Sequence, residues 1–173
     1  MSVTAEQQKA FVNAYLSLAD NCAKQLNIDN TIVLGQWALE SAWGTEFYVK
    51  SSRNLAGIMR GSAVASFATW TDFEVAYIQS MHNDCPNLRK GIHQTQASVI
   101  FEGTSYNTVN SQYAKLIQEL ADEIKTMIST PVQSATPAKV TPKEYTMSLA
   151  TSGMKIISAV VENETILIKY THA

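Results

Sequence analysis

The stretch VLGQWALESAWG, residues 33–44, most constrains how this chain can fold, because it sets one carboxylate in an otherwise apolar, aromatic-rich run. Residues three, four and seven apart share a helix face, so the face that carries Glu40 also carries Val33, Trp37 and Gly44. We expect that face to be buried or half-buried, and burying a carboxylate costs free energy unless it is paired or protonated. Two interpretations stay open: a Glu that reaches the helix edge or pairs with a basic residue, or a general acid whose pKa is raised by its surroundings.

Apolar residues at helical spacing predict an amphipathic helix before this run. They step by three or four positions through Phe11, Tyr15, Leu18, Cys22 and Leu26. Asp29 or Asn30 can then cap a second helix, and Gly44 is its expected stop. The segment NLAGIMRGSAVASFATW, residues 54–70, predicts two short strands around a turn of small residues.

Three further helices are expected before residue 128. The pattern TDFE at residues 71–74 is a capping box and predicts the start of the first of them. A shorter helix is expected over residues 94–102. Apolar spacing over residues 113–127 predicts the last one, with Asn110 or Ser111 as its cap. The sequence therefore predicts a compact, mainly helical domain with a small β element.

The composition shifts sharply after Ser129. The segment STPVQSATPAKVTPKEY holds three of the four prolines, each in a Thr-Pro pair, which is typical of an extended linker. Beyond it, the β-rich runs 155–161 and 165–170 predict a hairpin that is too small to fold alone and must pack on the main domain or a partner. The expected organisation is a catalytic domain at residues 1–128, a linker at 129–143 and a hairpin tail at 144–173.

Charge and hydropathy exclude two classes of partner. The net charge is −2, which provides no basic field for nucleic acid. No apolar run reaches the roughly 18 residues that a membrane span needs. The N-terminus is typical of an amphipathic helix rather than a signal peptide, so we expect synthesis in the cytoplasm and delivery to the periplasm or cell wall of a target cell by a route without a leader.

The cysteines and histidines predict no metal site and no cofactor. Cys22 and Cys85 are too few for a disulfide framework, although they could pair in an oxidising compartment. The histidines, His82, His93 and His172, have no metal-ligand spacing with cysteine or carboxylate residues.

Four motifs occur in an order that resembles a known family. ALESAWG, NLAGI, FATWTDFEVAYIQSM and SYNT…QYAKLI are similar to the motifs of glycoside hydrolase family 73, bacterial peptidoglycan N-acetylglucosaminidases of flagellar, phage and autolysin proteins. The resemblance covers about residues 8–127. It implies an α+β, mainly α fold: a lysozyme-like glucosaminidase domain with a reduced β element, to which the C-terminal β-hairpin tail is added. It also implies an endo-β-N-acetylglucosaminidase that cleaves β-1,4 bonds of the peptidoglycan glycan strand.

Carried over by motif, Glu40 is the catalytic acid, and Tyr106 and Tyr113 are the two tyrosines of the last motif, the first of them catalytic. The chain departs from the family pattern at three places. Ala56 stands where the family usually has Phe, and the two tyrosines are seven positions apart rather than six. Only RGSAVAS separates NLAGI from Phe67, so the longer β lobe that often supplies a second carboxylate is nearly absent.

The second catalytic group is therefore open. Glycoside hydrolysis normally uses an acid and a base or nucleophile. Four carboxylates are candidates, each with an ordinary structural explanation such as helix capping: Glu46, Asp72, Glu74 and Glu102. A lone acid also suffices if the substrate's 2-acetamido group attacks the anomeric carbon, or if a tyrosine or a positioned water completes the site.

Aromatic and amide side chains near the motifs are candidates for substrate binding. Trp37 is expected in the core, whereas four aromatic residues could either pack or stack on sugar rings: Trp43, Trp70, Tyr106 and Tyr113. Asn54 could bind an N-acetyl group, although Asn is also an ordinary turn residue.

Several functions compete at this stage. The alternatives to a glucosaminidase are a lytic transglycosylase or muramidase, a phage lysin, or an inactive wall-binding assembly protein. A wall hydrolase without a leader is typical of phage proteins and of toxins injected by type VI secretion. An injected toxin implies a periplasmic immunity protein, and we expect it to occlude the cleft at Glu40.

Overall fold

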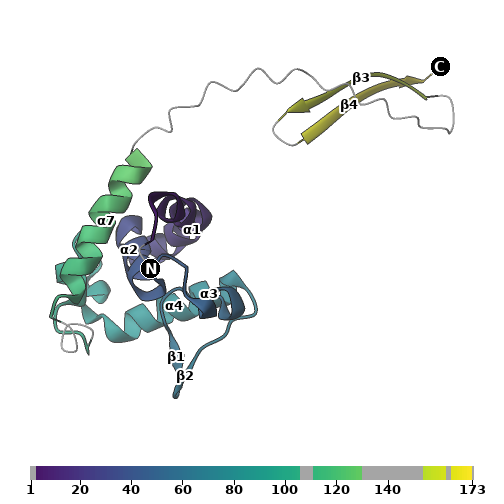
Figure 1. The fold of residues 1–173 in the computed structure, drawn as a ribbon. Helices are drawn as coiled ribbons and strands as arrows, with labels where there is room; N and C mark the ends of the chain where they lie inside the picture. The colour runs from purple at the N-terminus through teal and green to yellow at the C-terminus, as the bar shows by residue number, and fades with distance from the viewer. Residues whose placement is uncertain (1–2, 106–110, 130–153, 163–164, 173) are drawn as a thin grey trace. The chain divides into compact units, whose positions relative to one another are not determined.

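The computed structural model describes residues 3–105, 111–129, 154–162 and 165–172, and divides into two compact units, Met1–Thr130 and Pro131–Ala173. The first unit is mainly helical, with one small hairpin (Figure 1). Its elements are α1 (Ala5–Leu26), α2 (Asn30–Ser41), α3 (Phe47–Ser52), β1 (Met59–Arg60), β2 (Ala63–Val64), α4 (Trp70–Asp84), the 3-10 helix η1 (Pro86–Lys90), α5 (Ala97–Phe101) and α7 (Tyr113–Ser129).

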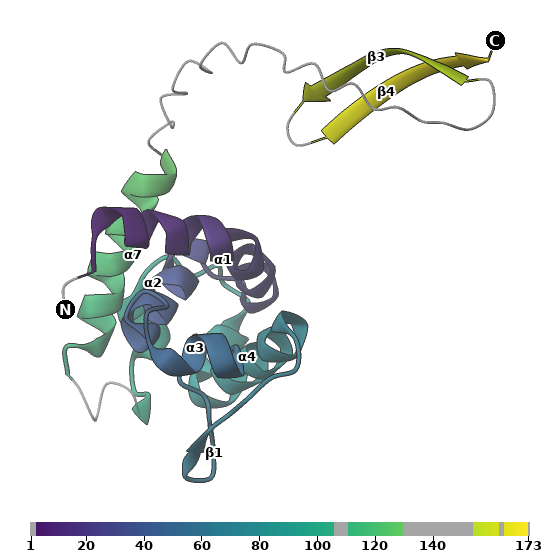
Figure 2. The ribbon, with the colours of Figure 1, turned by 45° about the vertical axis from the view of Figure 1, so that its right-hand side comes forward.

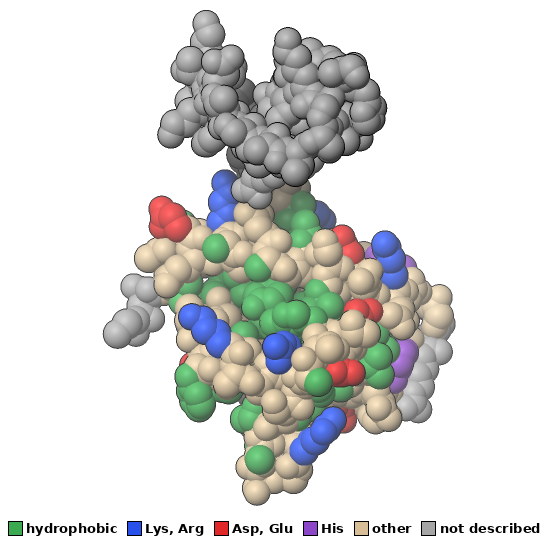
Figure 3. All heavy atoms as spheres, turned by 90° about the vertical axis from the view of Figure 1, so that its right-hand side faces the viewer, with side chains coloured by type: hydrophobic (Ala, Val, Ile, Leu, Met, Phe, Trp, Pro, Cys, Tyr) green, Lys and Arg blue, Asp and Glu red, His purple; other side chains and the backbone are tan. Residues whose placement is uncertain are grey.

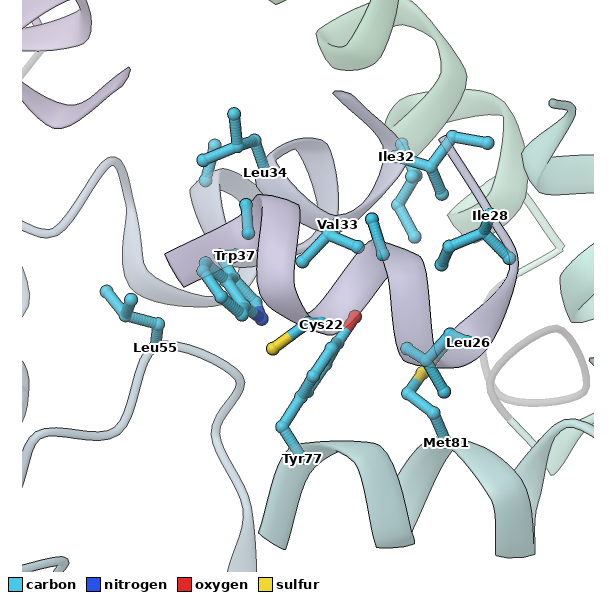
Figure 4. Close-up of a cluster of buried hydrophobic side chains, with 14 of the residues drawn as sticks. Cys22, Leu26, Ile28, Ile32, Val33, Leu34, Trp37, Leu55, Tyr77 and Met81 are labelled. Carbon is cyan, nitrogen blue, oxygen red and sulfur yellow. The ribbon is translucent and has the colours of Figure 1, made fainter. Parts of the chain in front are cut away.

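The core is built around α2, as the apolar run predicted. Eight consecutive residues of α2, from Thr31 to Ala38, are buried. The helix contacts α1 and α7, and both views of the ribbon show α7 beside it (Figures 1 and 2). Trp37 is fully buried, which confirms its expected place in the core, and Tyr77 of α4 reaches up to α2 (Figure 4).

The helix ends follow local capping chemistry, with one correction. The capping box of α4 joins Thr69 and Asp72, not Thr71 and Glu74: the Thr69 hydroxyl accepts from the Asp72 N–H at 3.1 Å, and the Asp72 carboxylate accepts from the Thr69 N–H at 2.9 Å. Both pairs fit the same sequence pattern, but the helix begins at Trp70. Glu74 instead accepts from the side chain of Gln25 of α1 at 3.1 Å.

Other boundaries also differ from the prediction. The second helix is preceded by Asp29, as expected, but it ends at Ser41 instead of Gly44. The shorter helix begins at Ala97 rather than residue 94, because Gln94 forms a parallel bridge with Ile28. Helices α3 and η1 were not predicted, since each is short and has no apolar period of its own.

The hairpin of β1 and β2 confirms the predicted small β element. The strands pair antiparallel, with Met59 opposite Val64. Asn54, which is fully buried, anchors the hairpin: its side-chain amide donates to the carbonyl oxygens of Ile58 at 2.9 Å and Ala65 at 3.0 Å, and its side-chain oxygen accepts from the Ile58 N–H at 3.0 Å. The sequence expectation that Asn54 binds substrate therefore meets a competing structural role, because both amide hydrogens are used inside the loop.

The second unit contains the predicted hairpin. Strands β3 (Met154–Glu162) and β4 (Thr165–His172) pair antiparallel, with a register shift between Ile156 and Ser158. Most of the expected linker, residues 130–143, lies outside the described residues, so the three-part division of the chain stays a prediction. Within the part of the chain that is described, no helix is long and apolar enough to cross a membrane.

Candidate active site

A cavity of about 350 Å³ opens beside the C-terminal half of α2. Three segments form its walls: α2, the loop that leads into β1, and the C-terminal half of α4. Its lining residues are Gln36, Glu40, Ala56, Gly57, Ile58, Met59, Tyr77, Ser80, Met81 and Asp84. The first unit therefore has a pocket that is lined by Glu40, the lone carboxylate of the apolar run.

Glu40 is half-buried at this pocket, and its environment favours the protonated form. Burial raises the pKa of its carboxyl above the ordinary value of 4.5. A hydrogen bond from the Tyr113 hydroxyl to Oε1, 2.6 Å long, works in the opposite direction because it stabilises the carboxylate. Burial is the stronger of the two effects, so the pKa of the Glu40 carboxyl lies above its ordinary value. This direction agrees with the second sequence interpretation, whose general-acid role stays a prediction.

The backbone around Glu40 is held by its own hydrogen bonds. The Glu40 carbonyl oxygen accepts from the Tyr48 hydroxyl at 2.6 Å. Just after α2, the backbone of Ala42 and Trp43 is left-handed, with φ of 47° and 58°. Residues other than glycine rarely adopt this conformation. Such strain persists only where the surroundings impose it, and it is common at functional sites. This sharp turn makes Glu40 the second-last residue of the helix.

Trp43 and Trp70 lie away from the cavity lining, in an aromatic cluster with α1. Trp43 packs edge-on against Phe11 with ring centroids 5.6 Å apart, and Trp70 packs against Tyr15 at 5.2 Å. Both indoles are half-buried. Hydrophobic side chains gather near the middle of the face shown in Figure 3, with basic side chains beside them. The structure brings Tyr113 to Glu40, but not the two tryptophans, and Tyr106 lies outside the described residues.

A second carboxylate at the cavity was missed by sequence reasoning. Asp84, in the last turn of α4, lines the pocket with Glu40 and accepts from the Ser80 hydroxyl at 3.0 Å. The signal was available, because Tyr77, Ser80 and Asp84 share one helix face. None of the four carboxylates considered earlier lines this pocket, and they lie at helix ends or on the surface: Glu46, Asp72, Glu74 and Glu102.

The described residues contain no group of three or more His, Cys, Asp or Glu side chains that could hold a metal ion. Cys22 and Cys85 are both buried free thiols, and burial raises the pKa of each to about 12. The ionisable side chains that line the cavity are the carboxyl groups of Glu40 and Asp84 and the hydroxyl of Tyr77.

Comparisons with known proteins give a family and similar solved structures. Residues 16–152 match the family model Glucosaminidase, described as mannosyl-glycoprotein endo-beta-N-acetylglucosaminidase. A type VI secretion system effector-immunity complex from Pseudomonas protegens has a similar fold, with a TM-score of 0.57, 19% identity, and coverage of 70% of this chain and 94% of that one.

A peptidoglycan hydrolase from Sphingomonas sp. A1 is also similar, with a TM-score of 0.55, 18% identity, and coverage of 76% and 99%. The search of curated proteins gives no match. The family match spans most of the chain, and the mainly helical domain with its small sheet has the lysozyme-like glucosaminidase fold. The chain therefore belongs to the glucosaminidase family, glycoside hydrolase family 73, and is a glycoside hydrolase.

Proposed function

We propose that this enzyme cleaves the β-1,4 bonds of the peptidoglycan glycan strand as an N-acetylglucosaminidase, with Glu40 as the general acid. The observation that carries the proposal is the half-buried Glu40 carboxyl, whose pKa burial raises, at a cavity of about 350 Å³. A raised pKa keeps a carboxylic acid protonated closer to neutral pH, as protonation of a leaving glycosidic oxygen requires. The peptidoglycan hydrolase from Sphingomonas sp. A1 supports the choice of substrate.

Asp84 is our proposal for the second catalytic group. Among the described residues it is the one other carboxylate that lines the pocket of Glu40. Asp84 lies seven residues, about 10 Å of helix, beyond Tyr77 along α4. It therefore lines a different part of the cavity from Glu40, which comes from α2. The cavity between them is far larger than the roughly 30 Å³ of one water. Asp84 would activate that water, whereas attack by the substrate's own acetamido group is the alternative route.

Substrate binding outside the cavity is proposed for the aromatic cluster. Trp43 beside Phe11 and Trp70 beside Tyr15 offer half-buried indole rings, and flat apolar rings of this kind suit the faces of sugar rings. Tyr113 would act through Glu40 rather than by stacking, because its ring is buried and its hydroxyl bonds the carboxyl. Tyr106 stays a catalytic candidate on the family motif alone.

Delivery as an antibacterial toxin is the finer part of the proposal. The similarity to an effector-immunity complex supports it. The partner would then be an immunity protein that covers the cleft, with an interface on the order of 1,600 Å² centred on aromatic residues such as Trp43 or Trp70. Co-expression with the neighbouring reading frame, followed by pull-down and a digestion assay, tests it. A complex without inhibition, or no complex, would favour a phage lysin.

Digestion of purified cell wall, with the products identified by mass spectrometry, tests the reaction. A reducing N-acetylglucosamine end is expected. A reducing or anhydro-muramic end would assign the enzyme to the muramidases or lytic transglycosylases. If the wild type released no products, the interpretation as an inactive wall-binding assembly protein would be favoured.

A further inference from the structure

We infer that Gln36 and Tyr77 are positioning residues which, through Tyr113, hold the Glu40 carboxyl so that its acidic proton resides on Oε2. The inference rests on the proposed role of Glu40 as the acid and adds the parts that orient it. The three residues come from three different helices, α2, α4 and α7, and Gln36 and Tyr77 also line the cavity beside Glu40.

The hydrogen bonds form one continuous chain. The Tyr77 hydroxyl donates to Gln36 Oε1 at 2.7 Å, Gln36 Nε2 donates to the Tyr113 hydroxyl oxygen at 3.1 Å, and that hydroxyl donates to Glu40 Oε1 at 2.6 Å. Figure 4 shows the Tyr77 ring rising from α4 toward Cys22 and Trp37. Glu40 is thereby joined to α4 and α7 at once.

The chain has a direction because its members are chemically asymmetric. An amide has a donor end and an acceptor end, and a tyrosine hydroxyl carries a single hydrogen. Since Tyr77 donates to the amide oxygen, the amide nitrogen of Gln36 faces Tyr113. Since Tyr113 accepts from that nitrogen, its own hydrogen is directed at Glu40. The orientation of the Gln36 amide therefore directs the Tyr113 hydrogen to Oε1 of Glu40, which accepts it.

Burial makes this arrangement hard to replace. Gln36 is 2% exposed, Tyr77 1% and Tyr113 7%. A buried polar group that loses its hydrogen-bond partner costs about 1–3 kcal/mol. A buried glutamine whose side-chain amide is hydrogen-bonded at both ends points to a role in orientation.

Among the described residues, no hydrogen bond is seen to Oε2 of Glu40, which faces the loop before β1. A Cβ built on Gly57 would lie 3.4 Å from Oε2, and Gly57 lines the cavity. When Oε1 accepts from Tyr113, the acid proton occupies Oε2. In the reaction that proton passes to the leaving oxygen, which keeps the electron pair of the broken C–O bond. Water adds its hydroxyl to the anomeric carbon and gives its remaining proton to the proposed base Asp84. Proton exchange with solvent then restores Glu40 and Asp84 to their starting states.

Tyr77→Phe and Gln36→Met test the inference, because both keep the shape of the core and break the chain. We expect kcat to fall about 10-fold or more with KM little changed, since a small displacement of a catalytic group is costly. Without the directed Tyr113 hydrogen the carboxylate loses a stabilising donor, so the pKa of Glu40 rises further. The alkaline limb of the pH–rate profile should therefore move to higher pH, and a carbon-13 NMR titration of Glu40 should show the same shift without substrate.

Phe73→Leu is the matched control, because Phe73 is fully buried in α4 one turn before Tyr77 but has no part in the chain. It should lower the melting temperature and leave the pH limb and the NMR titration in place. An unshifted Glu40 titration in both Tyr77→Phe and Gln36→Met would overturn the inference while leaving the proposed function intact. Full activity of Glu40→Gln would instead remove the proposed function.

Discussion

The hydroxyl of Tyr113 lies 2.6 Å from Oε1 of Glu40, although 73 positions separate the two residues in sequence. The contact exists because α7 packs along α2, so the first residue of α7 meets the last turn of α2. The acid of the proposed mechanism is therefore held by the packing of two helices, and changes to that packing should be seen in the activity.

Glu40→Gln should lower the rate of wall digestion at least 100-fold, the usual contribution of a positioned general acid. The glutamine side chain keeps the size of glutamate and an oxygen that can accept from Tyr113, so the fold should persist. Circular dichroism and release of soluble fragments from purified cell wall measure the two effects. Digestion at the wild-type rate would contradict the assignment of Glu40.

The same variant should be more stable than the wild type at neutral pH. Burial raises the folded-state pKa of Glu40. The contribution of the protonated carboxyl to the free energy of unfolding is therefore fully present below about pH 4.5, and it is lost as the pH rises through the folded-state pKa. The difference in melting temperature should thus be small at pH 4 and grow, in favour of Glu40→Gln, towards pH 7. Melting curves across this range check the sign, and a difference that is constant with pH would speak against a raised pKa.

Gly57→Ala should reduce activity more than Gly61→Ala, although both change the same hairpin region. The two glycines have nearly equal positive φ, 62° and 63°, so the backbone cost of about 1–2 kcal/mol is matched. The new methyl group at 57 would lie 3.4 Å from Glu40 Oε2, whereas at 61 nothing lies within 4 Å. Parallel activity and melting measurements separate the two effects, and equal losses of activity would show that the space beside Oε2 is unimportant.

Periodicity and short motifs were enough to predict the framework of the fold. The apolar steps of α1 and α7 and the buried run of α2 follow helical spacing directly, and the small turn at Gly61 predicted the hairpin. The capping box at Thr69 shows the limit of such local patterns, because two overlapping matches differed only in tertiary context. Glu74 accepts a hydrogen bond from Gln25 of α1, and this bond depends on the packing of α1 beside α4.

The part of the site that lies within one helix could be predicted from the sequence. The parts that depend on contacts between helices could not. Glu40 stood out because a carboxylate in an apolar run needs a special environment. Asp84 did not, because an acidic residue near a helix end looks ordinary until α4 is placed against the cavity. Likewise nothing local linked Gln36 with Tyr77, which lie 41 positions apart.

Asp84→Ala should lower the rate by about 100-fold or more if Asp84 activates the water. Sodium azide, a small nucleophile that needs no base, should then restore turnover and give a glycosyl azide. Asp72→Asn is the control, since it weakens the α4 cap by about 1 kcal/mol and lies outside the cavity lining. Near-normal rates for Asp84→Ala, with no effect of azide, would favour attack by the acetamido group.

Gly35→Ala should be the most disruptive single methyl group in the first unit, and it connects packing to chemistry. A Cβ at this position would lie 2.8 Å from the Ile117 carbonyl oxygen and 3.1 Å from the Ala121 nitrogen, both main-chain atoms of α7. Helix backbones cannot rotate away as side chains do, so α2 and α7 must separate, at a cost of about 1–3 kcal/mol despite the better helix propensity of alanine. The melting temperature should fall by several degrees.

That separation should also lengthen the bond between Tyr113 and Glu40, so activity should fall at temperatures where the variant is still folded. The second variant Gly35→Ala with Ala121→Gly should not recover, because removing a side chain leaves both clashing main-chain atoms in place. Recovery of stability and activity in that double variant would show that the close approach depends on the Ala121 methyl group instead, and that α7 can be moved on α2 without loss of the acid.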